Sequence, residues 1–229
     1  MPCQRPADAV EHTTSPSFAA VAIDDHLIAL DKPAGLLAVP GRGVDKADCV
    51  SSRVQASYPE ALIVHRLDQA TSGLLLMARG LAMQRALSRA FEQREVNKCY
   101  VAVAAGHLGK APGDSGVIEL PLVADWPRRP LQKVDHNTGK PALTHWRVLG
   151  YDGVAGRVAT RLELMPVTGR THQLRVHLAA IGHPLLGDAL YAPPEVCGAA
   201  PRLLLHAERL TLVHPVSGAA LDLRVPAPF

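Results

Sequence analysis

A short polar segment, residues 65–73 with the sequence HRLDQATSG, comes directly before a run of aliphatic residues. It places the Arg66 guanidinium and the Asp68 carboxylate on the same side of the chain if the segment is extended. A neighbouring cation favours the ionised carboxylate, which suits a nucleophile or a base better than a general acid. A structural ion pair that fixes a loop explains the same pattern. From these residues alone, the structural ion pair is the better interpretation.

A strand pattern over residues 98–103 contains the second group that could act on a ligand. Its alternate apolar residues share one face, so Tyr100 is expected on the opposite face, beside Lys98. There the tyrosine ring could stack on a base while the lysine meets a phosphate. A partly buried tyrosine that covers a second layer of the fold is the alternative.

The third candidate segment is residues 168–175, with the sequence TGRTHQLR. A glycine turn that contains Arg170 leads here into a predicted helix, whose N-terminus favours anions. The anion could be a phosphate or the Asp68 carboxylate. Ordinary helix capping with a surface arginine is the alternative.

The elements that must position these groups follow from the periodicity of apolar residues. Strands outnumber helices, and several adjacent strands have links of hairpin length, which predicts a mixed α+β fold with a largely antiparallel sheet flanked by helices and loops. We expect a flexible leader over residues 1–16 and a single domain over residues 17–229. Strands are expected at 18–23, 26–31, 73–78, 98–104, 117–123, 144–149, 158–165, 203–213 and 220–225, and helices at about 50–58, 83–91 and 172–181.

Composition limits the function further. Hydrophobic residues make up 48% of the 229 residues, enough for a sizeable core. The apolar runs are too short to span a bilayer, and no signal peptide is recognisable, so we expect no membrane association. The four cysteines are scattered, which argues against a disulfide or zinc framework and for a reducing cytoplasm. A net charge of +3 is only a weak indication of an anionic partner.

Motifs for common cofactors are missing from the sequence. We find no P-loop, no Rossmann glycine pattern and no Gly-x-Ser-x-Gly elbow. The histidines of the 172–183 region lack the spacing of a helical metal pair, so no metal site is predicted. A cofactor-free reaction built on one carboxylate is what remains.

Four segments together resemble the RluA-type pseudouridine synthases. The 65–73 segment is similar to the signature of this family, and the resemblance extends in the same order over roughly residues 20–229. The other three segments are a lysine-proline turn at residues 31–37, the tyrosine strand at 98–102 and the arginine motif at 169–177, which continues to Gly187-Asp188.

The resemblance implies a role for each candidate residue. Asp68 would be the catalytic carboxylate, attacking either the ribose C1′ or the uracil ring, so that the base detaches, rotates and rejoins through C5. Tyr100 would stack on the uracil and is a candidate for proton removal, and Leu174 would pack on the opposite face. Arg170 would pair with Asp68, and Arg66 would fill the gap left by the flipped nucleotide.

Loop sequences at residues 125–130, 138–142 and 202–208 resemble the short subgroup of the family, which lacks an extra N-terminal RNA-binding domain. The resemblance implies action on uridine 32 in the tRNA anticodon stem-loop and on uridine 746 in 23S rRNA. We expect the protein to be a monomer. Basic side chains would hold the RNA backbone, and Trp126 would either stack on a loop base or anchor its own loop. These basic side chains are Arg85, Arg89, Arg128, Arg129 and Lys133.

Two other function classes remain open beside the isomerase. One is a non-catalytic RNA-binding or RNA-folding protein on the same scaffold. The other is a glycosidase-like hydrolase, which requires a second carboxylate that the sequence does not place near Asp68.

Overall fold

The computed structural model describes residues 18–41, 47–154 and 156–229, so the leader predicted at residues 1–16 lies outside the described residues. The strands are β1 (Ala19–Ile23), β2 (Leu27–Lys32), β3 (Ala61–Ile63), β4 (Ser72–Arg79), β5 (Asn97–Ala105), β6 (Ser115–Glu119), β7 (Leu122–Ala124), β8 (Gln132–Val134), β9 (Leu143–Val154), β10 (Arg157–Pro166), β11 (Leu205–Val213) and β12 (Ala220–Arg224). The helices are α1 (Val50–Gln55), α2 (Leu81–Glu92), α3 (Gln173–Ala180) and α4 (Pro194–Cys197), with a 3-10 turn η2 (Trp126–Arg128).

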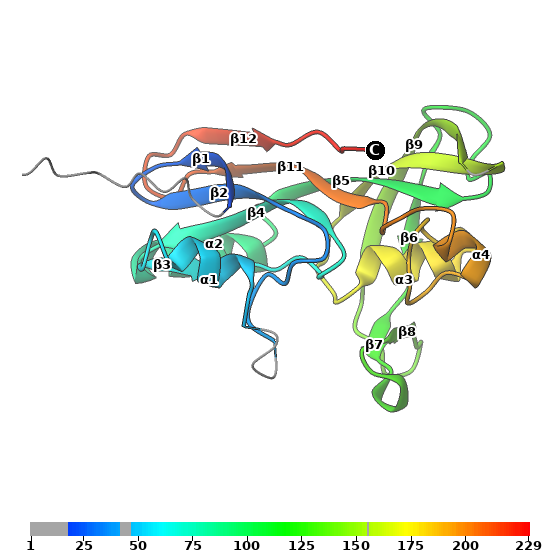
Figure 1. The fold of residues 1–229 in the computed structure, drawn as a ribbon, viewed down its shortest axis with the longest axis horizontal. Coiled ribbons are helices and arrows are strands. Elements are labelled where there is room, and N and C mark those ends of the chain that lie inside the picture. The colour runs from blue at the N-terminus through cyan, green and yellow to red at the C-terminus, as the bar shows by residue number, and fades with distance from the viewer. Residues whose placement is uncertain (1–17, 42–46, 155) are drawn as a thin grey trace, which may run out of the picture.

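One large sheet organises the described residues. Its strand order is β1-β2-β4-β11-β5-β10-β9-β6, with β12 added to β11 and β3 to β4 (Figure 1). Every pair of strands in it is antiparallel except β4 with β11, which run parallel. The predicted α+β fold with a largely antiparallel sheet is confirmed.

The central strands are buried on both faces, which explains their continuous apolar sequences. On β4, Leu74 and Leu76 belong to the core cluster that contains the apolar side of α2. Leu75 and Met77 belong to the cluster that contains the apolar side of α1. Alternate side chains of β4 therefore pack against α2 on one face of the sheet and against α1 on the other.

The two halves of the sheet meet where β4 and β11 run side by side, with Gly73 opposite Ala207. Gly73 has φ 106°, and a Cβ built on it would lie 2.3 Å from the Ala207 carbonyl oxygen. Only glycine allows this approach without strain. The position follows the Asp68 loop directly, so the same glycine fixes where that loop enters the sheet.

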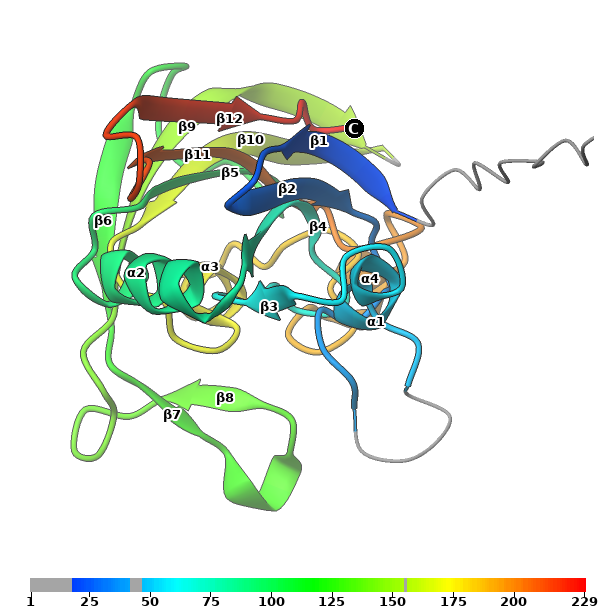
Figure 2. The ribbon, with the colours of Figure 1, turned by 90° about the vertical axis from the view of Figure 1, so that its left-hand side faces the viewer.

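The prediction of a single strand at residues 117–123 is wrong. The structure has two strands there, β6 and β7, which are separated at Leu120-Pro121. Pro121 cannot donate a backbone hydrogen bond to a ladder, so the chain leaves the large sheet there. β7 pairs instead with β8, which the sequence did not predict, and together they form a hairpin that projects from the rest of the molecule (Figure 2).

None of the helices in the described part of the chain is long and apolar enough to cross a membrane, and the longest, α2, has 12 residues.

Candidate active site

A cleft of about 680 Å³ opens where the two halves of the sheet meet. Its walls come from the 65–69 loop, the end of α2, the start of β5 and the 166–175 segment. Asp68, Arg66, Tyr100, Arg170 and Leu174 all line it. The residues that the sequence singled out from three distant segments therefore share one cavity.

The Asp68 loop is held from the side that faces away from solvent. Leu67 is buried among the residues that pack on α1, while Arg66 is exposed and Asp68 keeps a side-chain exposure of 25%. His65 stacks on Phe91 with ring centroids 4.4 Å apart, and its Nε2 accepts a hydrogen bond of 2.9 Å from the backbone of Leu76. Burial lowers the pKa of His65 to about 3, so the ring is neutral at pH 7.

Lys32 ties the lysine-proline turn to this loop. Its side chain has 0% exposure, and its Nζ donates to the carbonyl oxygens of Pro33, Leu36 and Gln69 at 2.9, 2.7 and 3.1 Å. The Gln69 carbonyl also accepts from the Gly35 N–H at 2.8 Å. Burial lowers the pKa of Lys32 to about 8, and the negative charge of Asp68 opposes that shift. The lysine thus acts as a buried cross-link that places the backbone next to Asp68.

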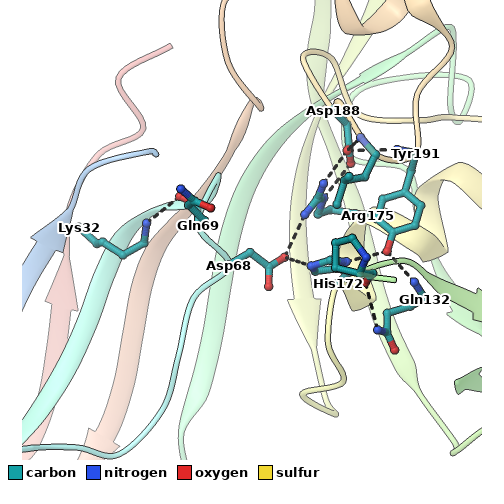
Figure 3. A network of polar contacts seen from close by, with 10 residues as sticks. Lys32, Asp68, Gln69, Gln132, His172, Arg175, Asp188 and Tyr191 are labelled. Atoms are coloured by element: carbon teal, nitrogen blue, oxygen red, sulfur yellow. Dashed lines mark hydrogen bonds and ion pairs between the residues drawn. The ribbon is translucent and has the colours of Figure 1, made fainter. Parts of the chain in front are cut away.

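Asp68 pairs with Arg175, in the first turn of α3. The Arg175 Nη1 lies 3.4 Å from the Asp68 Oδ2, while its Nε and Nη2 donate to Asp188 at 2.8 and 2.7 Å (Figure 3). Arg175 is 4% exposed and Asp188 1% exposed, so this pair is nearly sealed from water. A bidentate guanidinium–carboxylate pair fixes orientation as well as charge.

The family resemblance implied this contact for Arg170, but in the structure Arg170 has another partner. Arg170 lines the cleft, but its Nε donates to the Pro141 carbonyl at 3.1 Å. Among the described residues, the basic groups within 4 Å of the Asp68 carboxylate are Arg175 and His172. Arg170 precedes the first turn of α3, so its side chain leaves the chain in another direction than Arg175.

His172 is the second basic group beside Asp68. It stands at the N-terminus of α3 in the left-handed region, with φ 53°, and its Nε2 lies 3.8 Å from the Asp68 Oδ2. Its Nδ1 is hydrogen-bonded to the Tyr191 hydroxyl at 2.6 Å. Burial lowers the pKa of His172, which favours the neutral ring, although the Asp68 carboxylate acts in the opposite direction.

Tyr100 and Leu174 supply the apolar part of the cleft. Leu174 is 6% exposed and lies in the same core cluster that partly buried Tyr100 packs against. Burial raises the pKa of Tyr100, and the Asp68 charge raises it further. The hydroxyl therefore remains protonated at neutral pH, so Tyr100 presents an uncharged ring beside Asp68.

Sequence reasoning missed the roles of Lys32, His172, Arg175, Asp188 and Tyr191. The first four lie in segments already quoted for the family resemblance, so their residue types were visible. Which of them meets Asp68 depends on the rotation of α3 and on a segment beyond it. Tyr191, three residues after Asp188, carried no local signal.

This fold and this cleft define a class of enzyme. Residues 26–180 match the family model for RNA pseudouridylate synthases, and the chain belongs to that family. The predicted enzyme class, an isomerase that makes pseudouridine in RNA, is confirmed.

Individual relatives narrow the comparison. The chain is 50% identical over 206 residues to the dual-specificity RNA pseudouridine synthase RluA of Escherichia coli K12, covering 90% of this chain and 91% of that protein. The RluA of Yersinia pestis is 48% identical and is covered over 97% of its length. The solved structure of human RNA pseudouridylate synthase domain containing 1 matches with a TM-score of 0.77 and 27% identity, over 99% of this chain and 87% of that one.

Proposed function

We propose that this protein converts uridine 32 of the tRNA anticodon stem-loop and uridine 746 of 23S rRNA to pseudouridine, with Asp68 as the catalytic group. One observation carries the proposal. The only acidic side chain contributed by the 65–73 segment lies in a cleft between the halves of the sheet and is held by a buried arginine. The dual specificity named for the relatives that are 50% identical supports the choice of two RNAs.

The cleft fits a single extruded nucleotide. A base must leave its stack before its glycosidic bond can be reached, at a cost of a few kcal/mol. Stacking of the uracil between Tyr100 and Leu174 would offset part of that cost, and exposed Arg66 would fill the vacated space in the RNA. Arg175 and His172 would hold the Asp68 carboxylate towards the ribose C1′ or the uracil ring.

The reaction as proposed needs no cofactor and no metal, because it is an intramolecular exchange of N1 for C5. In attack on the ribose, the Asp68 carboxylate bonds to C1′ as the C1′–N1 bond breaks, and the uracil leaves with the electron pair on N1. The base rotates and C5 bonds to C1′ as the Asp68–C1′ bond breaks, after which the C5 proton is lost and N1 takes up a proton. In attack on the uracil ring, the bond from Asp68 to the ring breaks once C5 is joined to C1′, which regenerates the carboxylate. The protein would act as a monomer in the cytoplasm, with residues 17–229 as one catalytic domain.

The test is an isosteric substitution of the proposed catalytic group. Asp68→Asn should bind both RNA stem-loops and form no pseudouridine, measured by carbodiimide treatment and primer extension. Asp25→Asn, at an exposed position in the β1–β2 turn, is the matched control and should keep full activity. Substrates with cytidine in place of the target uridine should give no signal.

Undiminished product from Asp68→Asn would refute the catalytic role. If the wild-type protein binds both RNAs and produces no pseudouridine in either, the non-catalytic RNA-binding alternative replaces the proposal. Product in one RNA alone would limit the substrate to that RNA.

A further inference from the structure

The β7–β8 hairpin ends in an exposed tip that carries two stacked side chains. Trp126 is 67% exposed, and the Arg129 guanidinium carbon lies 3.2 Å from the centre of the indole ring. Burying such a ring is favourable by a few kcal/mol, so leaving it in water costs stability. The exposed ring therefore excludes the second role considered for Trp126, an anchor within its own loop.

The tip is held in one conformation before any ligand arrives. Asp125 is 5% exposed and accepts a hydrogen bond of 2.7 Å from the Arg128 Nε. Its backbone N–H donates to the Leu131 carbonyl at 2.9 Å, which closes the loop. A preformed surface loses little conformational entropy on binding.

The charges of the tip leave one cation available. Arg128 is neutralised by Asp125, and Lys133 lies 3.6 Å from Asp135. Within the described residues, Arg129 has no acidic partner and stacks on Trp126 instead. A cation on an indole presents a flat surface with positive charge, which suits a nucleobase and its phosphate.

The end of the hairpin next to its tip is bonded to the active site, through the first residue of β8. The Gln132 N–H of β8 donates to the Tyr191 hydroxyl at 2.9 Å, and that hydroxyl is bonded to His172 beside Asp68 (Figure 3). The Tyr191 side chain thus links the hairpin to His172, which lines the cleft. An RNA that inserts a uridine into the cleft would therefore bring neighbouring nucleotides towards this hairpin.

We propose that the Trp126–Arg129 pair stacks on a second, unpaired base of the substrate RNA, outside the cleft. This inference rests on the proposed function, because it takes the same RNA as ligand. A protein partner fits less well, since Trp126 is the only large hydrophobic residue exposed on the described hairpin and a stable protein interface needs a wider apolar core. The contact would select RNAs with an unpaired nucleotide at a set distance from the target.

Fluorescence provides a direct test, because the chain has two tryptophans and the other, Trp146, is partly buried in β9. In an Asp68→Asn protein that also carries Trp146→Phe, the remaining signal comes from Trp126. Titration with the anticodon stem-loop should quench it, whereas a blunt RNA duplex without unpaired bases should not. An unchanged signal at saturating stem-loop would overturn the proposal and leave the tip for a protein partner.

Kinetics provide an independent test on the otherwise wild-type chain. Trp126→Ala and Arg129→Ala should each weaken stem-loop binding and raise KM by about ten-fold while kcat stays near wild type. Trp126→Phe should restore most of the affinity, because it keeps a ring. Arg157→Ala removes the same charge from the exposed first position of β10 and should change neither constant.

The outcomes separate this proposal from the proposed function. Pseudouridine formation by the wild-type protein is measured first and decides the activity alone. If that activity is present and Trp126→Ala leaves KM and affinity unchanged, the hairpin proposal fails while the function stands. If the activity is absent, the RNA affinity of Trp126→Ala still tests the stacking. An affinity weaker than that of the wild type supports it, and an unchanged affinity refutes it.

Discussion

Three charges of alternating sign lie in a row from the cleft into the core: Asp68, Arg175 and Asp188. The Arg175–Asp188 contact is 2.7 Å and buried, while the Arg175–Asp68 contact is 3.4 Å and partly exposed. The guanidinium of Arg175 therefore interacts more strongly with Asp188 than with Asp68. It orients the Asp68 carboxylate without fully neutralising its charge. A carboxylate in this position keeps the electron density that attack on a carbon requires.

This arrangement predicts different effects for the two arginines of the 169–177 motif. Arg175→Lys keeps the charge and loses the planar fork that serves two carboxylates, so kcat should fall by about 10²-fold in a folded protein. Arg170→Lys should leave kcat within a few-fold, because Arg170 contacts the Pro141 carbonyl instead of Asp68. Single-turnover rates with a stem-loop RNA measure both. The reverse ranking would show that Arg170 is the working partner of Asp68.

At the scale of elements, the Asp68 loop owes its shape to the turn after β2. The buried ammonium of Lys32 donates to three backbone carbonyls, and one of them belongs to the residue after Asp68. Buried carbonyls without a donor are costly. The turn and the loop therefore fold as one unit, although 36 residues separate Lys32 from Asp68 in the chain.

Removing that ammonium should damage stability and activity together. Lys32→Met fills the same space and leaves the Pro33 and Leu36 carbonyls without a donor, while the Gln69 carbonyl keeps the Gly35 N–H. The free energy of unfolding should therefore fall by about 3 kcal/mol or more. Urea denaturation measures the loss, and kcat should fall with it because the Asp68 backbone is released. Lys110→Met, at an exposed position, is the control. Wild-type stability in Lys32→Met would refute the cross-link.

At the scale of the whole molecule, the two halves of the sheet are joined where β4 meets β11, directly behind the active-site loop. Residues from both halves line the cleft. The site therefore exists only when the halves are packed together. A substitution at Gly73, within this junction, therefore tests how far the stability of the whole fold depends on it.

Gly73→Ala should destabilise the entire fold. Its Cβ would meet the Ala207 carbonyl oxygen at 2.3 Å, and φ 106° is strained for any residue with a side chain. We expect a loss of about 3 kcal/mol or more in the free energy of unfolding, or no soluble protein. Gly150→Ala is the control, since a Cβ there meets nothing within 4 Å. Equal stability of both variants would contradict the close approach.

Partly buried His65 makes the stability of the protein depend on pH. Its pKa is about 3 in the folded protein, against about 6.5 in the unfolded chain. Between these values only the unfolded chain binds the proton, so stability should fall as the pH is lowered from 6.5 towards 3, with a slope that approaches about 1.4 kcal/mol per pH unit. His65→Gln keeps an acceptor for the Leu76 N–H and lacks the titration. Its urea-derived slope between pH 6 and pH 4 should be shallower by about 1 kcal/mol per unit, and equal slopes would refute the assignment.

The sequence by itself determined the parts of the protein that depend on local patterns. The β1–β2 hairpin, β4, α2 and β10 were predicted because alternation, helical spacing and turn residues act within a few positions along the chain. The sequence also selected Asp68 and Tyr100, whose residue types stood out from their surroundings. Both line the same cleft.

Only the tertiary structure decided which groups meet Asp68. Arg170 and Arg175 belong to one motif, and the sequence could not tell which of them turns towards the carboxylate. Asp188, which follows α3 in the chain, determines which arginine it is, because its carboxylate binds the Arg175 guanidinium and holds it next to Asp68. The link from the β7–β8 hairpin through Tyr191 to His172 has the same origin. Such contacts join segments that become neighbours only when the sheet has formed, and no local period encodes them.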